Sequence, residues 1–154
     1  MGKKLPQVSV GQLYKKQIMK NYALILIVAT LVGCATSPIS LNEATSVPPN
    51  RIYYNPAKTG SSAKIIVVRD TGFQAGGVYA HFFINETRAA SLDTGEALYL
   101  SIPPGDYSFG VHLTDPLHAE NMFSIDQSIK DGKIYRYRIL IDHNGARIVH
   151  IFKE

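Results

Sequence analysis

The sequence predicts an all-β protein, a small antiparallel β-sandwich of about seven to nine short strands that follows a signal peptide and a flexible tether. Short apolar segments alternate with turn residues throughout residues 51–154. In one of them, Tyr107–Leu113, apolar and polar side chains alternate with the period of two that a half-buried strand requires. No stretch after residue 50 shows a convincing helical repeat of its apolar residues.

Residues 1–33 are predicted to be a lipoprotein signal peptide. Tyr22–Val32 is an uncharged run of 11 residues, which as a helix spans about 17 Å against roughly 30 Å of bilayer hydrocarbon. It is too short for a membrane span, but with Lys20 before it and small residues after it, it suits an export signal. We expect translation to start at Met19; the alternative is an extended leader from Met1.

The apolar run ends in Leu31-Val32-Gly33-Cys34, which resembles the bacterial lipobox. The resemblance implies cleavage before Cys34 and acylation of its thiol and new amino group by chains such as palmitate, an anchor that hardly dissociates. The residue after the cysteine is Ala35, whereas lipoproteins kept in the inner membrane carry Asp there. The resemblance therefore implies transfer to the outer membrane, with the domain facing the periplasm. Cys34 is the only cysteine, so an internal disulfide is excluded. Alternative interpretations, a chance cysteine at a helix end or a catalytic thiol, fit this position less well.

Residues 34–50 are predicted to form a flexible tether, because Ser, Thr, Pro and Asn dominate and no apolar periodicity appears. Its role would be to hold the domain away from the membrane surface. The alternative is an ordered arm that packs on the domain through Ile39, Leu41 and Val47.

The basic character of the chain belongs to the leader. The formal net charge is +4, but from Cys34 onward 11 Lys or Arg stand against 12 Asp or Glu, which leaves −1. An electrostatic case for nucleic-acid binding is therefore absent.

Candidate strands of the domain, in chain order, are Arg51–Tyr54, Lys64–Asp70, Val78–Asn85, Ala89–Leu92, Glu96–Ile102, Tyr107–Leu113, Met122–Ile129, Ile134–Asp142 and Ala146–Phe152. Turn residues separate them. Asn144-Gly145 predicts a hairpin between the last two strands, since both residues tolerate positive φ. Pro103-Pro104-Gly105-Asp106 ends one strand and begins the next, and Asp131-Gly132 does the same further on. Asp115–Asn121 is expected to form one helical turn at most.

Several segments resemble a family of uncharacterised small bacterial lipoproteins, a domain of unknown function. They are Pro49-Asn50-Arg51-Ile52-Tyr53-Tyr54, the I-N-E-T-R-A-A-S-L segment, which we interpret as a hairpin, and L-S-I-P-P-G-D-Y with its P-P-G-x-Y turn. The resemblance covers most of residues 49–113. It implies a fold and a location, and it supplies no catalytic residue.

No motif of an activated serine, a zinc site or a phosphate loop is present in the sequence, and we predict no catalytic residue, metal or cofactor. His81 and His112 could approach each other across strands, with Asp70 or Asp115 nearby, as a metal site would need. We favour the interpretation that they are isolated strand histidines. Acids at strand ends, which we interpret as turn formers, are Asp93, Glu96, Asp106 and Asp115.

One arrangement points to binding. Arg136 and Arg138 fall on the same side of a tyrosine-rich strand, and Arg147 lies on its predicted hairpin partner. A basic, aromatic strip of this kind recognises carboxylates, sugars or anionic headgroups. The alternative is a solvated sheet face with cross-strand ion pairs.

These observations favour a non-enzymatic binding or accessory module of the cell envelope, held to the membrane by its lipid and partnered by an envelope protein or glycan. A lipid-tethered hydrolase acting on peptidoglycan or envelope sugars is the first alternative. A structural or stress-response lipoprotein with a mechanical role is the second.

Overall fold

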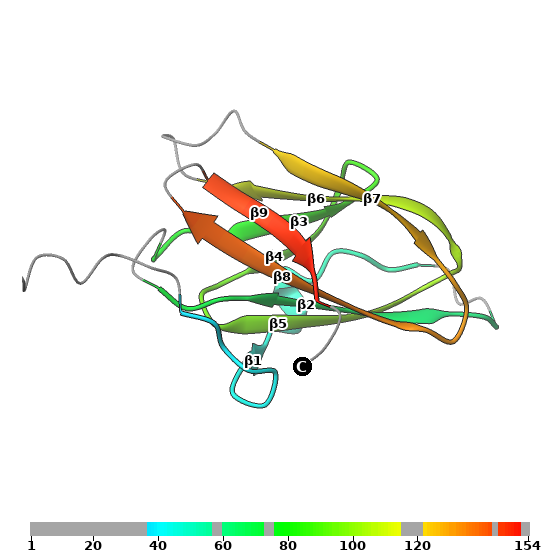
Figure 1. The fold of residues 1–154 in the computed structure, drawn as a ribbon, viewed down its shortest axis with the longest axis horizontal. Helices are drawn as coiled ribbons and strands as arrows, with labels where there is room; N and C mark the ends of the chain where they lie inside the picture. The colour runs from blue at the N-terminus through cyan, green and yellow to red at the C-terminus, as the bar shows by residue number, and fades with distance from the viewer. Residues whose placement is uncertain (1–36, 57–59, 73–75, 115–121, 143–144, 152–154) are drawn as a thin grey trace, which may run out of the picture. The chain divides into compact units, whose positions relative to one another are not determined.

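The computed structural model describes residues 37–56, 60–72, 76–114, 122–142 and 145–151. The chain divides into two units, residues 1–33 and 34–154, and the described residues all belong to the second (Figure 1). The predicted signal peptide, Cys34 and the predicted helical turn at Asp115–Asn121 lie outside the described residues. Within the described ranges, no helix has the length and apolar character needed to cross a membrane.

The described residues form two β-sheets that pack face to face. The elements are β1 (Thr45–Ser46), the 3-10 helix η1 (Pro49–Arg51), β2 (Ala63–Arg69), β3 (Ala80–Ile84), β4 (Thr87–Leu92), β5 (Glu96–Ile102), β6 (Gly105–Leu113), β7 (Phe123–Ile129), β8 (Ile134–Asp142) and β9 (Gly145–His150). One sheet has the order β1-β5-β2-β8-β9 and the other β4-β3-β6-β7 (Figure 1). The predicted all-β sandwich is confirmed.

Most predicted strands are present. β5 and β8 have the predicted bounds, and six others differ from the prediction by one or two residues at one or both ends. The strand predicted at Arg51–Tyr54 is wrong, because the chain there forms η1 followed by a single bridge between Ile52 and Ala90. Pro48 and Pro49 explain the difference, since proline fixes φ and suits the first turn of a helix.

The five-stranded sheet is mixed, whereas the sequence predicted antiparallel pairing throughout. β2 pairs antiparallel with β5 but parallel with β8, and the short β1 pairs parallel with β5. Parallel neighbours need a crossover connection. The chain between β2 and β8 contains β5 and all four strands of the second sheet, and it enters β8 in the direction of β2.

The hairpins agree with the predicted turns. β3 and β4 are joined at Asn85-Glu86, and both residues have positive φ (48° and 64°), as a tight two-residue hairpin turn requires. β8 and β9 pair antiparallel, although residues 143–144 of their turn lie outside the described residues. The P-P-G-x-Y turn carries the chain from one sheet to the other, and the Tyr107 hydroxyl closes it by donating to the Pro103 carbonyl at 3.0 Å.

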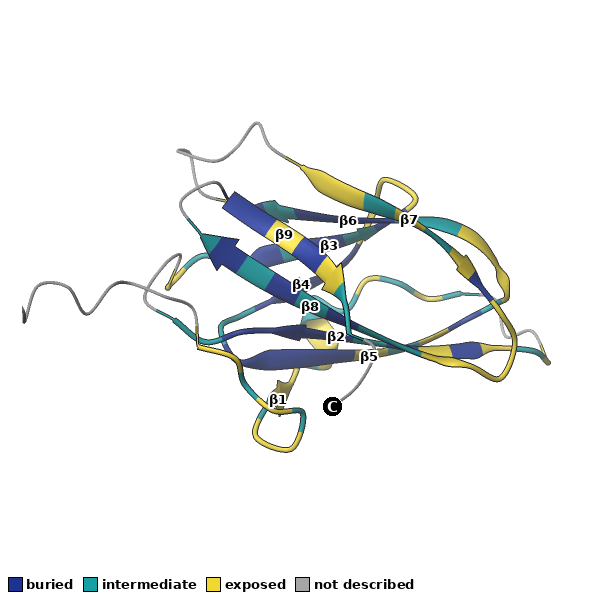
Figure 2. Ribbon diagram, in the orientation of Figure 1, coloured by how far each residue is buried: buried dark blue, intermediate teal, exposed yellow. Residues whose placement is uncertain are grey.

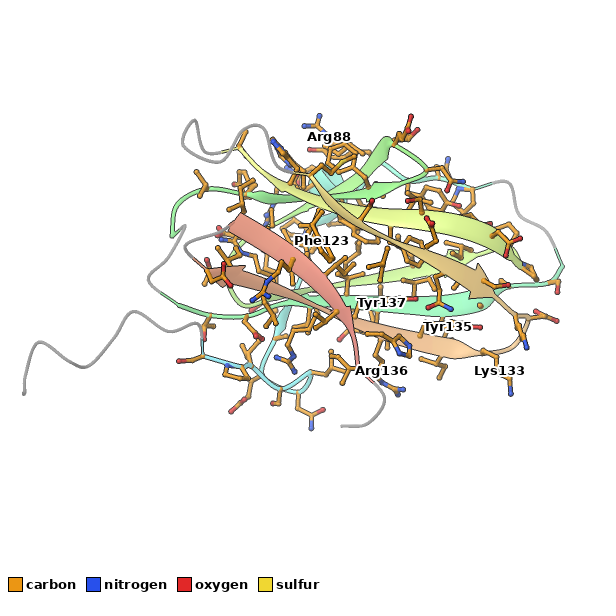
Figure 3. The ribbon with its side chains drawn as sticks, turned by 45° about the horizontal axis from the view of Figure 1, so that its top comes forward. Arg88, Phe123, Lys133, Tyr135, Arg136 and Tyr137 are labelled. Atoms are coloured by element: carbon orange, nitrogen blue, oxygen red, sulfur yellow. The ribbon has the colours of Figure 1, made fainter. Side chains whose placement is uncertain are left out.

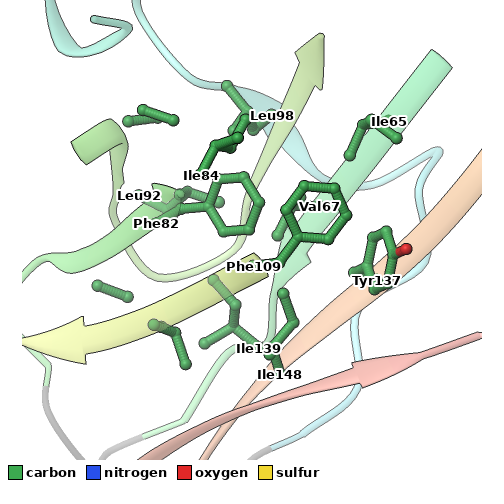
Figure 4. Packing of buried hydrophobic residues seen from close by; sticks show 14 of the residues in the cluster. Ile65, Val67, Phe82, Ile84, Leu92, Leu98, Phe109, Tyr137, Ile139 and Ile148 are labelled. Carbon is green, nitrogen blue, oxygen red and sulfur yellow. The ribbon is translucent and has the colours of Figure 1, made fainter. Parts of the chain in front are cut away.

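The core lies between the sheets and is built from alternate residues of each strand (Figures 2 and 4). Phe109 is at its centre, with its ring 5.6 Å from that of Phe82 and 5.2 Å from that of Tyr137. These three rings join the two sheets, because Phe82 and Phe109 come from β3 and β6 and Tyr137 comes from β8. Such offset and edge contacts each add about 0.5–1.5 kcal/mol to the apolar burial.

Tyr137 offers a test of the core. Its side chain is fully buried and its hydroxyl has no hydrogen-bond partner among the described residues. Burial raises the pKa of Tyr137, because the phenolate is disfavoured away from water. We expect Tyr137→Phe to raise the free energy of unfolding by about 1 kcal/mol, since a buried hydroxyl without a partner is destabilising. Urea denaturation measures the change.

Tyr135 is the matched control on the same strand. Its hydroxyl accepts a hydrogen bond from the Lys130 backbone N–H at 2.9 Å. Tyr135→Phe is therefore expected to lower the free energy of unfolding by about 1 kcal/mol. Equal losses in the two variants would show that the Tyr137 hydroxyl contributes a bond of its own.

Residues 37–50 are an ordered arm and not the free tether predicted over 34–50. Ser37 and Thr71 exchange two backbone hydrogen bonds of 2.6 and 3.1 Å, β1 pairs with β5, and Val47 is buried in the core. The alternative interpretation, an arm that packs on the domain, describes this segment. The polar composition predicted flexibility. The arm is instead held by backbone hydrogen bonds with the edge of β5, and such bonds do not depend on the type of side chain.

Candidate functional site

The three predicted arginines share one face of the five-stranded sheet. Arg136 and Arg138 alternate with the buried Tyr137 on β8, so they project away from the core. Figure 3 labels Arg136 and Tyr137 on this strand. Arg147 on β9 is in register with Leu140, which lies on the same face of β8 as Arg136 and Arg138. The structure therefore brings the three together on one face, but their surroundings differ.

Arg138 holds the arm to the sheet. Its guanidinium forms an ion pair with Asp70, whose side chain is 1 % exposed, and also donates to the Ile39 carbonyl at 3.1 Å. The Ile39 N–H in turn donates to the same Asp70 carboxylate at 3.3 Å. Arg138 thus neutralises a buried acid and fixes the arm, and its charge is committed to this structural role.

Arg147 forms an ion pair with Asp142 at 2.5 Å, and the two side chains are 50 % and 30 % exposed. Pairs as exposed as this one stabilise a protein by about 0–1 kcal/mol. For Arg138 and Arg147, the alternative of a sheet face with ion pairs is the better description.

Arg136 has different neighbours: its partner on β2 is apolar, and the acid Glu43 of the arm, which accepts a hydrogen bond from the Ser40 hydroxyl, lines the same groove. Strand pairing places Arg136 beside Ile66 of β2, and Ile66 lies beside Tyr99 of β5. Two residues earlier on both β2 and β8, Lys64 lies beside Ile134. Tyr99 is 49 % and Ile134 47 % exposed. We call Lys64, Ile66, Tyr99, Ile134 and Arg136 the outer patch. Within the described part of the chain, neither Lys64 nor Arg136 forms an ion pair.

Two hollows flank the outer patch. A shallow hollow of about 240 Å³ lies over β2 and β5 and is lined by Lys64, Ile66 and Tyr99, among others. A groove of about 610 Å³ runs between the arm and the two arginines of β8. Arg136 lines this groove and is in register with Ile66 of the hollow.

The outer patch combines two cations, one half-exposed aromatic ring and exposed aliphatic surface. A guanidinium binds planar carboxylates with two parallel bonds, and tyrosine adds an amphipathic stacking surface. The patch therefore fits a partner that carries carboxylate groups on an otherwise apolar or sugar-like surface. Of the predicted arginines, only Arg136 belongs to it.

The histidines are cross-strand neighbours, as the sequence suggested, but they have other bonds. His81 and His112 are in register on β3 and β6. The His81 ring nitrogens lie 2.8 Å from the Ser91 hydroxyl and 3.2 Å from the Thr114 hydroxyl. Asp70 directly follows β2 of the other sheet, where it is bonded to Arg138, and Asp115 lies outside the described residues. Within the described residues, no cluster of three or more His, Cys, Asp or Glu could hold a metal ion.

His81 makes stability depend on pH. Burial, together with the nearby Arg88 and His112, lowers the pKa of His81 below its usual 6.5. The unfolded chain then takes up a proton at a higher pH than the folded protein does, so stability is lost as the pH falls through 6.5.

We expect unfolding midpoints in urea to fall between about pH 7.5 and about pH 5.5, and to fall less in His81→Asn. Asparagine can keep the bond to Ser91 but cannot titrate. An unchanged slope in the variant would contradict this origin of the pH dependence.

The structure contains a buried charge cluster that the sequence did not predict. The Arg69 side chain is 1 % exposed and projects between the sheets, where it donates to the carbonyls of Val78 (2.7 Å) and Leu92 (2.8 Å). Burial lowers the pKa of Arg69, and Asp93 and Glu96 oppose that shift. The sequence held one signal: Arg69 continues the buried row of Ile65 and Val67, and a charge at a core position is unusual.

Glu96 joins this cluster to η1. Its carboxylate forms an ion pair with Arg51 and accepts a hydrogen bond from the Asp93 backbone N–H at 2.6 Å. The bond to Glu96 raises the pKa of Arg51. The guanidinium of Arg51 also lies 4.9 Å from the centre of the Tyr79 ring. These bonds connect the two sheets and η1, so we assign the cluster a structural role.

Comparisons with known proteins add no family. No protein-family model matches the chain, and a search of the curated proteins finds no match. The resemblance to small bacterial lipoproteins therefore stays a prediction.

Proposed function

We propose that this protein is a lipoprotein of the cell envelope, anchored through acylated Cys34 in the outer membrane and facing the periplasm. Its β-sandwich acts as a non-enzymatic binding module for a carboxylate-bearing envelope partner, protein or glycan. The leader sequence supports the anchor, and the outer patch supports the binding.

The observation that carries the binding function is the exposure of Tyr99 and Ile134 beside Arg136. Tyr99 and Ile134 are large side chains, each about half exposed. They lie beside Ile66 and Lys64, which are two residues apart on β2. Exposed apolar surface beside charged groups is typical of interaction sites. Arginine and tyrosine are also the residues that contribute most often to binding energy.

The alternative hydrolase would need an acid or histidine in a desolvated cleft. Asp70 and Glu96 are buried, but each is paired with an arginine, and His81 is bonded to two hydroxyls. Asp106 and Asp126 line a groove of about 470 Å³ on β6 and β7, but both are exposed. Glycoside hydrolases hold their proton donor in a desolvated site. These observations favour binding over hydrolysis.

Photo-crosslinking in cells tests the proposal. A photoreactive phenylalanine in place of Tyr99 is expected to give a discrete adduct, identified by mass spectrometry. Arg136→Ala is expected to reduce that adduct about tenfold or more, since a paired guanidinium contributes about 1.5–3 kcal/mol.

Tyr53 is the matched control position, because it is a tyrosine of nearly the same exposure, 47 % against 49 %, outside the outer patch. The same adducts from both positions would contradict a specific site. Adducts with lipid alone at Tyr99 would favour the structural role.

A further inference from the structure

The arm determines where the membrane anchor lies on the domain. Its first described residue, Ser37, is bonded at the end of β2, where the two backbone bonds to Thr71 are joined by a third from the Thr71 hydroxyl to the Ser37 carbonyl at 2.9 Å. Ile39 is held two residues later by Asp70 and Arg138. The arm is therefore attached to the sheet immediately after its beginning.

Little chain remains between the anchor and this attachment. Cys34 and Ser37 are three residues apart, and three residues span at most about 11 Å even when fully extended. A flexible chain over the whole of 34–50 would have an average reach of about 22 Å and a maximum of about 55 Å.

We propose that the end of the sandwich that carries Thr71 lies against the bilayer surface, within about 11 Å of the acylated residue. The inference rests on the proposed function, because it needs acylation at Cys34. The domain is thus held close to the membrane by this end.

The chemistry of this end suits a headgroup surface. The described residues of the loops after β2 and β4 are mostly small and uncharged: Thr71, Gly72, Gly76, Gly77, Thr94 and Gly95. These loops also hold Asp93 and the exposed Tyr79, and the arm carries the exposed acid Glu43. The acid at the end of β8, Asp142, is paired with Arg147. Contact with the headgroups therefore desolvates few charged side chains among the described residues.

The same geometry directs the outer patch away from the lipid. Ile66, in the row of Tyr99 and Arg136, lies five residues along β2 from Thr71, which is about 17 Å at ~3.3 Å per residue. The row of Lys64 and Ile134 is about 23 Å away. The patch thus faces a periplasmic partner, and anionic headgroups of the same membrane are out of its reach.

Contact quenching in vesicles tests this orientation. The acylated protein is reconstituted in vesicles that contain lipids with a spin-labelled headgroup, and a thiol-reactive fluorophore is placed at one of two positions. Gly76→Cys reports on the proposed membrane end, and Lys133→Cys reports on the turn before β8, at the opposite end (Figure 3). Acylated Cys34 does not react with the dye, so each variant carries one label.

We expect the label at position 76 to be quenched several-fold more than the label at position 133. A flexible Gly/Ser insertion of about 20 residues between Ala35 and Thr36, with an average reach of about 25 Å, should remove most of the difference without touching the fold. Equal quenching at the two positions without the insertion, or stronger quenching at 133, would overturn the inference and leave the lipoprotein proposal intact.

Mass spectrometry of the same preparation separates the two proposals. Acyl chains on Cys34 are the expected result. An unmodified Cys34 thiol, which would also take up the dye, would overturn the lipoprotein proposal and the orientation with it.

Discussion

Arg138→Ala is expected to lower the free energy of unfolding by about 3–5 kcal/mol and to detach the arm from the sheet. The substitution leaves the carboxylate of Asp70, 1 % exposed, without its counter-ion. It also removes the bond that the guanidinium donates to the Ile39 carbonyl. Removal of one partner of a buried pair is costly, because the remaining charge has neither water nor a counter-ion.

Urea denaturation measures the loss of stability, and hydrogen exchange at the amides of Ser37 and Ile39 reports the release of the arm. Both amides donate to the domain and should be protected in the wild type. We expect exchange at both to become faster in the variant than the loss of global stability alone explains.

Arg147→Ala is the matched control, since it removes another arginine from an ion pair on the same face. That pair is exposed, so a change of about 0–1 kcal/mol is expected. If the two variants lost similar amounts, the Asp70 pair would have no special role. In the double variant Arg138→Ala with Asp70→Asn, the loss should be smaller than the sum of the single losses, because the uncompensated charge is gone.

Arg69→Ala is expected to have an effect of similar size, about 4–5 kcal/mol. The substitution leaves the carbonyls of Val78 and Leu92 without a donor that bonds them at 2.7 and 2.8 Å. It also opens a cavity between the sheets, because Arg69 is the largest of the fully buried side chains.

Arg69→Met separates the two causes, since methionine fills most of the space and donates no hydrogen bond. We expect it to lose about 2–3 kcal/mol, the part that belongs to the two carbonyls. Chemical denaturation of both variants measures the difference. A methionine variant as stable as the wild type would show that the bonds across the sheets contribute nothing net, as happens when apolar residues replace some buried charges.

The candidate site was only partly visible in the sequence. Period-two alternation along β8 placed Arg136 and Arg138 on the same side, and the structure has them there. Nothing local distinguished the two arginines. Arg138 is bonded to Asp70, 68 residues away in the sequence, and to Ile39, 99 residues away. Arg136 lies beside Ile66 of β2, a strand that is its neighbour only in the folded sheet.

The sequence by itself determined the all-β class, the positions of eight strands and the hairpin turns, because apolar alternation and turn residues act over a few residues. Its leader also supplied the expectation of a lipid anchor. Only the tertiary structure decided the parallel pairing of β2 with β8, the attachment of the arm and the burial of Arg69. These features depend on hydrogen bonds and ion pairs between distant segments, which the composition of neither segment reveals.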